Sequence, residues 1–62
     1  MPKNKITLEL TDDLAMALAQ FCKRAGYSDY RLRAKNDKEA DLIESAMIII
    51  RRELNEAGFN PR

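Results

Sequence analysis

Apolar and polar residues alternate near the beginning of the chain. The alternating positions are Ile6, Leu8 and Leu10 on one side, and Lys5, Thr7 and Glu9 on the other. A period of two residues is typical of a strand with one buried face. A single strand cannot satisfy its own backbone hydrogen-bonding groups, and no other segment repeats the pattern. We therefore expect a strand over residues 5–11 that pairs antiparallel with the same strand of a second chain.

The next segment has the period of a helix. Thr11 can cap its N-terminus, and Asp12 and Asp13 suit the positive end of the helix dipole. The expected apolar stripe consists of Leu14, Leu18, Phe21, Cys22 and Ala25. Gly26 can end the helix in a left-handed conformation, as glycine often does. The pattern predicts a helix over residues 12–25.

A longer helix is predicted in the second half of the chain. Asn36 can cap it, with Glu39 at the position of a capping box. Apolar residues then recur at alternating spacings of three and four: Ala40, Ile43, Met47, Ile50, Leu54 and Ala57. Gly58 can end the helix in a Schellman motif. We therefore expect a helix over residues 37–57.

This second helix is apolar on more than one side. Besides the stripe just described, Leu42, Ala46 and Ile49 form a second line, and Ile48 adds a third direction. One strand and one shorter helix cannot cover all of these side chains, so we expect a second copy of the chain to do so. The predicted interface of this homodimer consists of Ile6, Leu8, Leu10, Ile43, Met47, Ile50 and Leu54.

The chain is short for an independently stable domain. Its 62 residues are 45% hydrophobic and 34% charged, a composition typical of a single globular domain. It has one cysteine, Cys22, and no histidine, so neither an internal disulfide nor a zinc site of the usual ligands is expected. No metal or other cofactor is predicted. Association with a second copy is therefore the expected source of additional stability.

The residues of a catalytic site are missing from the sequence. It contains no glycine-rich phosphate loop and no nucleophile with a neighbouring base. The longest apolar run, residues 46–50, is far shorter than the roughly 20 residues of a membrane span. We expect a protein of the cytoplasm that is not an enzyme and does not enter a membrane.

The residues between the two predicted helices are expected to form a basic link over 26–36, with a short helical turn at 29–34. The chain has a formal net charge of only +1, yet its charges are unevenly distributed. Six basic and two acidic residues lie within 23–38, whereas five acidic and two basic residues lie within 39–56. The link predicts a surface that contacts phosphate groups. Its expected contact residues are Arg31, Arg33, Lys35, Asn36 and Lys38. The alternative is a solvated loop whose cations pair with the acidic part of the second helix.

A short strand followed by a capped helix and a longer helix resembles the ribbon-helix-helix family of small dimeric DNA-binding proteins. The resemblance is carried by KITLELTDDL at residues 5–14 and by GYS at 26–28, although the link is longer than is usual in that family. It implies a mainly α fold with one N-terminal β-strand (β-α-α), forming one domain over 1–62 in an intertwined homodimer. It also implies that outward residues of the paired strands contact bases. The residues at those positions are Lys3, Lys5, Thr7 and Glu9.

The resemblance implies a homodimer that binds double-stranded DNA, as a transcriptional repressor or accessory factor of a phage, plasmid or bacterial operon. The chain is also similar to short bacterial and mobile-element proteins, through ALAQF at residues 17–21 and AGFNPR at 57–62. The alternative function is a non-enzymatic module that binds another protein and no DNA. The near-neutral net charge and Glu9 on the predicted strand face favour this alternative.

Overall fold

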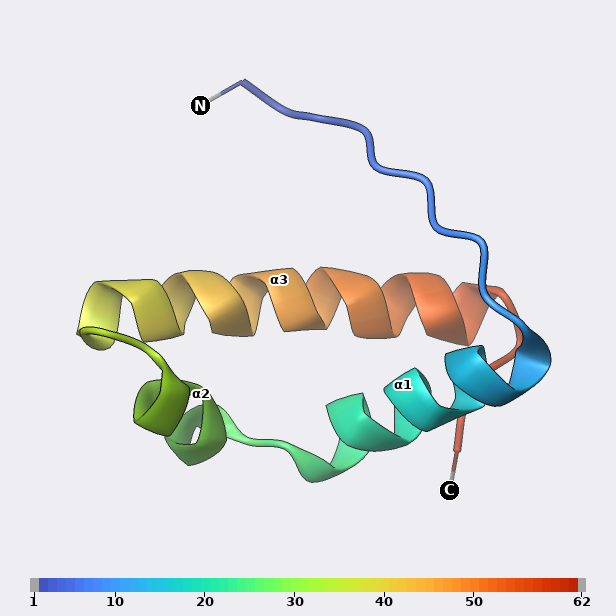
Figure 1. The fold of residues 1–62 in the computed structure, drawn as a ribbon. Coiled ribbons are helices and arrows are strands. Elements are labelled where there is room, and N and C mark those ends of the chain that lie inside the picture. The colour runs from blue at the N-terminus through green and yellow to red at the C-terminus, as the bar shows by residue number, and fades with distance from the viewer. Residues whose placement is uncertain (1, 62) are drawn as a thin grey trace.

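Three helices make up the regular secondary structure of the computed structural model, which describes residues 2–61 (Figure 1). They are α1 (Asp12–Arg24), α2 (Tyr27–Arg33) and α3 (Asp37–Glu56). α1 and α2 follow one another along the same side of α3, and each packs against it. α3 therefore connects the two halves of the fold.

The strand predicted over residues 5–11 is wrong. Residues 2–11, here called the N-terminal arm, form neither helix nor strand and lead away from α1 (Figure 1). The arm's apolar side chains Ile6, Leu8 and Leu10 are 78%, 63% and 40% exposed. An alternating pattern specifies which face of a strand would be buried, but the strand itself needs the backbone of a neighbour. Within residues 2–61 no segment supplies one, so the predicted β-α-α fold with its paired strands is replaced by three helices.

The link between the predicted helices contains a helix of its own, longer than the expected turn. α1 begins after the Thr11 cap, whose Oγ1 accepts the N–H of Leu14 at 3.2 Å, and it ends at Arg24. Gly26 does not end α1 in a left-handed conformation, because its φ of −126° is extended. Its N–H instead donates to Oδ2 of Asp29 at 2.8 Å, at the start of α2. The predicted role of Gly26 is therefore wrong, since it caps the following helix.

Asn36 caps the start of α3, as predicted. Its Oδ1 accepts the N–H of Glu39 at 2.8 Å. We expect Asn36→Ala to lower the free energy of unfolding by about 1 kcal/mol, because this N–H loses its acceptor. Urea denaturation followed by far-ultraviolet circular dichroism measures the change. Asn4→Ala in the N-terminal arm is the control and should change the stability by less than about 0.5 kcal/mol. Equal losses in both variants would contradict the capping role.

α3 ends in the predicted Schellman motif. Gly58 has a φ of 99°, in the left-handed region that glycine adopts without strain. The N–H of Phe59 donates to the carbonyl of Leu54 at 2.9 Å, and the N–H of Gly58 donates to the carbonyl of Asn55 at 3.1 Å. These two hydrogen bonds define the motif. They also turn the chain so that Phe59 packs against the core.

The core lies between α1 and α3. Its buried residues are Ala15, Ala19 and Cys22 of α1 and Leu54 of α3, with Leu18, Met47, Ile50 and Phe59 partly buried around them. The predicted stripe of α1 is therefore displaced by about one residue, because Leu14 and Phe21 are 57% and 53% exposed. The buried residues of α1 have small side chains, which allow α3 to approach closely.

A second contact joins α2 to α3. Tyr30 is the buried residue of α2, and Ala40 in the first turns of α3 has no exposed surface. A helix of seven residues is too short to be stable by itself. Packing against α3, with Tyr30 as the buried residue, is therefore what holds α2 in place.

Candidate nucleic-acid interface

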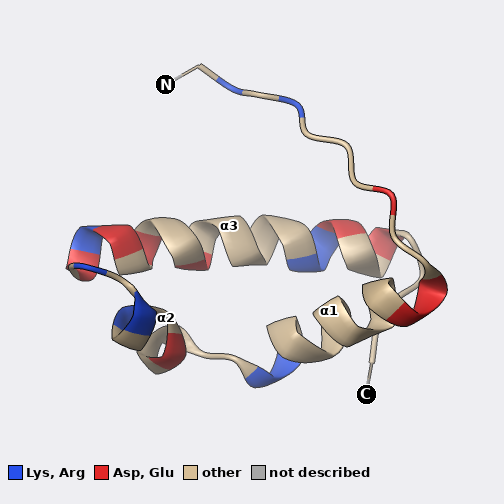
Figure 2. Ribbon diagram, viewed as in Figure 1, with Lys and Arg blue, Asp and Glu red and all other residues tan. Residues whose placement is uncertain are grey.

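Four cations gather where α2 leads into α3. Arg31 and Arg33 lie in the last turn of α2, Lys35 lies in the short connection, and Lys38 lies in the first turn of α3. All four are exposed, and Figure 2 shows them as blue segments at one end of the molecule. We call these four residues the basic corner. The short α2 brings them together, because it folds the link back against the start of α3.

Arg31 is held within the basic corner by two contacts. Its Nε donates to the carboxylate of Asp37, and its Nη1 donates to the carbonyl of Ala34 at 3.2 Å. The Arg31–Asp37 contact is the single salt bridge among residues 2–61. The link cations are thus paired with the acids of α3 at this one point in the described chain. Arg33, Lys35 and Lys38 supply the remaining positive charge.

The start of α3 is not itself a strong anion site. Asp37 and Glu39 lie in its first turn, where their charges offset the positive end of the helix dipole. Asn36, predicted as a phosphate contact, uses its Oδ1 for the helix cap. The carboxylate of Glu39 accepts the N–H of Lys35 at 3.1 Å. The attraction for phosphate therefore comes from the arginine and lysine side chains.

The residues predicted to contact bases are not brought to the basic corner. They lie exposed in the N-terminal arm: Lys3, Lys5, Thr7 and Glu9. The arm begins beside the C-terminal end of α3 and extends away from the helices, on the side of α3 opposite α2 (Figure 1). The two halves of the predicted DNA surface are thus apart within one chain.

Several of the predicted dimer-interface residues of α3 pack within their own chain. Leu54 is buried, and Met47 and Ile50 pack around the core formed with α1, while Ile43 is half-buried. This surface is therefore largely used in folding a single chain. The interface residues of the arm, Ile6 and Leu8 among them, remain exposed.

Cys22 packs as a small apolar side chain. It is 4% exposed, and burial raises the pKa of its thiol, an effect that the positive charge of Arg51 partly offsets. Burial also raises the pKa of Tyr30. Both groups are therefore neutral at pH 7, and neither is in the ionised form that acts as a nucleophile or base.

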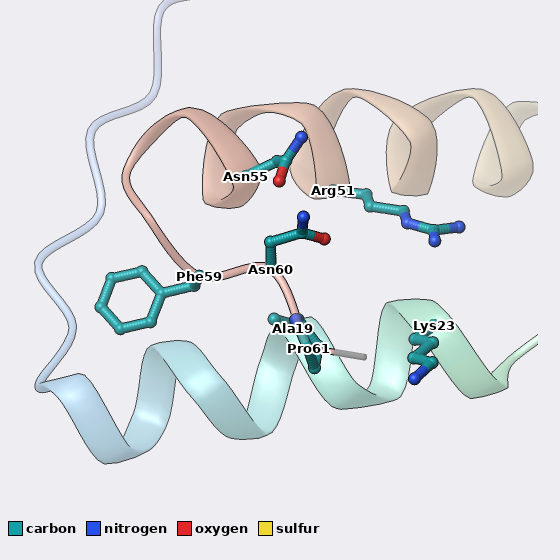
Figure 3. Close-up of a pocket in the computed structure, with 7 residues that line it drawn as sticks. All are labelled: Ala19, Lys23, Arg51, Asn55, Phe59, Asn60 and Pro61. Carbon is teal, nitrogen blue, oxygen red and sulfur yellow. The ribbon is translucent and has the colours of Figure 1, made fainter.

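Two hollows on the surface of the described residues are small. One lies between α1, α3 and the C-terminal segment and has a volume of about 10 Å³, enough for a single water molecule (Figure 3). Its lining residues are Ala19, Lys23, Arg51, Asn55, Phe59, Asn60 and Pro61. A wider hollow of about 170 Å³ lies between Cys22, Tyr30 and Met47. Both are smaller than the roughly 300 Å³ at which small-molecule sites usually begin.

Residues 2–61 contain neither a metal-binding cluster nor a membrane-spanning helix. No group of three or more acidic or cysteine side chains is placed to hold a metal ion in this part of the chain. No helix there has both the length and the apolar character needed to cross a membrane. Two cations that are far apart in the sequence, Lys23 of α1 and Arg51 of α3, project from facing helices (Figure 3). The sequence held no signal for this pair, because it depends on how α1 and α3 pack.

A family model matches residues 1–62 of the chain, and its description reads "Family of unknown function (DUF7706)". The chain belongs to this family. No curated protein and no solved structure matches it. Membership in DUF7706 assigns no activity or partner, and none of these comparisons points to ribbon-helix-helix proteins. The chemistry of the surface is therefore the basis for a functional proposal.

Proposed function

We propose that this protein is a non-enzymatic DNA-binding protein whose basic corner contacts the phosphate backbone. The observation that supports this proposal is the grouping of exposed Arg33, Lys35 and Lys38 around one bend of the chain, beside the paired Arg31. Cations of this kind supply most of the sequence-independent affinity for DNA. The proposed biological role is that of a repressor or accessory factor of a phage, plasmid or bacterial operon.

The basic corner is suited to holding a duplex rather than to distinguishing its sequence. Its members are long, flexible cations, which bind phosphate oxygens without reading bases. The affinity is therefore expected to depend steeply on salt and only weakly on DNA sequence.

The test is the salt dependence of binding to a fluorescent duplex, followed by anisotropy. The wild-type chain should bind at micromolar concentration in 50 mM salt and weaken as salt is raised. Arg33→Gln combined with Lys35→Gln should reduce the log–log slope by about 1.8, since each lost phosphate contact removes about 0.9. Neither side chain forms a salt bridge in the described structure, so the fold should be retained.

The matched control is Lys3→Gln combined with Lys5→Gln, which removes the same charge from the N-terminal arm. It should leave the slope nearly unchanged. A reduced slope in the arm variant alone would assign the contact to the predicted base-reading residues and contradict the basic corner. The absence of binding to any duplex in 50 mM salt would contradict the proposal as a whole.

A protein-binding module is the second candidate, and the exposed apolar surface favours it. Eleven large hydrophobic residues within 2–61 are exposed, including Leu32 at 77% and Ile48 at 60%. Such surface commonly marks contacts with other proteins. A purified complex with a second protein at fixed stoichiometry, lacking nucleic-acid absorbance at 260 nm, would favour this candidate. Binding of duplex DNA by the purified chain alone would favour the first.

A further inference from the structure

One exposed face of α3 has apolar and small residues along its centre, a basic residue at one end and an acidic residue at the other. It begins with Lys38 and Leu42, passes the small residues Ser45 and Ala46, and continues with Ile49 and Glu53. Spacings of three and four residues place these side chains on one side of the helix. Leu42 and Ile49 are 53% and 51% exposed, and the other four residues are also exposed.

We propose that this face, here called the α3 face, binds the same face of a second copy of the chain, with the two helices antiparallel. In a two-fold interface each contact between two different residues occurs twice. With the axis between Ser45 and Ala46, Leu42 of one copy lies opposite Ile49 of the other. The small residues lie at the crossing point, where they allow the two helices to approach closely.

The charges on the α3 face favour this register. The same axis places Lys38 of one copy opposite Glu53 of the other, so two pairs of opposite charges flank the apolar centre. A parallel arrangement in register would instead place Lys38 beside Lys38 and Glu53 beside Glu53. Like charges at close range disfavour that alternative. A second copy therefore matches this face in both apolar and charged positions.

The α3 face is separate from the surface that packs on α1. The side chains that face α1 include Leu54, Met47 and Ile50. A dimer through the α3 face thus leaves each folded chain intact and needs no strand pairing. It also places two basic corners at opposite ends of the paired helices, although the dimer itself requires no DNA.

The test is the mass of the full chain in solution without DNA, measured by sedimentation equilibrium over micromolar to millimolar concentrations. The wild-type chain should reach the mass of two copies. Ile49→Glu should weaken the dimer by at least about tenfold, because a charge would be buried in its centre. Ile48→Glu is the matched control, since Ile48 is exposed on another side of α3 and should leave the dimer unchanged.

A charge exchange tests the register. Lys38→Glu and Glu53→Lys should each weaken the dimer by about two- to thirty-fold, because two symmetric pairs are lost. The double variant restores opposite charges and should recover most of the wild-type affinity. Circular dichroism verifies that each variant is folded.

Three results would overturn the inference. A folded wild-type chain that stays monomeric at millimolar concentration would exclude the dimer. A double variant weaker than both single variants would exclude the register. A dimer that is insensitive to Ile49→Glu but lost with Ile6→Ser would assign the interface to the N-terminal arm. Because no DNA is present in these measurements, they can fail while the proposed DNA contact holds, and the reverse also applies.

Discussion

Leu54→Ala should lower the free energy of unfolding by about 2–5 kcal/mol, the range for removing a buried leucine side chain. Leu54 is 8% exposed and belongs to the cluster formed with Ala15, Ala19 and Cys22. Its buried neighbours on α1 have small side chains that cannot fill the space it leaves. A chain of this length is expected to have a total stability of only about 3–9 kcal/mol. The substitution should therefore remove a large part of it.

Urea denaturation at low micromolar concentration measures this loss. Leu32→Ala is the matched control, because Leu32 lies in α2 and is 77% exposed. The free energy of unfolding of the Leu32→Ala variant should differ from that of the wild-type chain by less than about 0.5 kcal/mol. A similar loss in both variants would show that Leu54 does not occupy the core described for it.

Tyr30→Ala should release α2 from α3 and lower the free energy of unfolding by about 3 kcal/mol, the lower end of the range for large aromatic residues. Tyr30 is 9% exposed and is the buried residue of a helix with seven residues. Without it, α2 has too little packing to remain helical. Amide hydrogen exchange over residues 27–33 should accelerate strongly, whereas α1 should change less.

Tyr30→Phe is the matched control for this prediction. It keeps the aromatic ring that packs beneath α2 and removes the hydroxyl group. Amide exchange in α2 should stay close to that of the wild-type chain. If Tyr30→Ala leaves the exchange of α2 unchanged, another contact must hold this helix.

Release of α2 also bears on the proposed function. The short helix brings Arg31 and Arg33 to the start of α3. Tyr30→Ala should therefore weaken DNA binding without changing the charge of the chain. Tyr30→Phe should bind as the wild type does.

The cations of the basic corner were identified from the sequence, but their arrangement was not. Their positions in the chain placed them before and within the first turn of α3, and the structure gathers them there. The pairing of Arg31 with Asp37 required the bend between α2 and α3. The predicted base-reading residues of the N-terminal arm depended on a strand that does not form.

The sequence by itself determined where the main helices begin and where α3 ends. The caps Thr11 and Asn36 and the Schellman turn at Gly58 were predicted and are present. Each involves hydrogen bonds between residues at most five positions apart. Such contacts form within one segment of chain, so a local pattern is sufficient to predict them.

Only the tertiary structure decided which faces are covered. On α1 the line through Leu14 and the line through Ala15 both have helical spacing, and the close approach of α3 buries the second. The alternating residues of the N-terminal arm needed the backbone of another strand, which residues 2–61 do not supply. Periodicity identifies apolar faces, whereas burial depends on distant segments that pack against them.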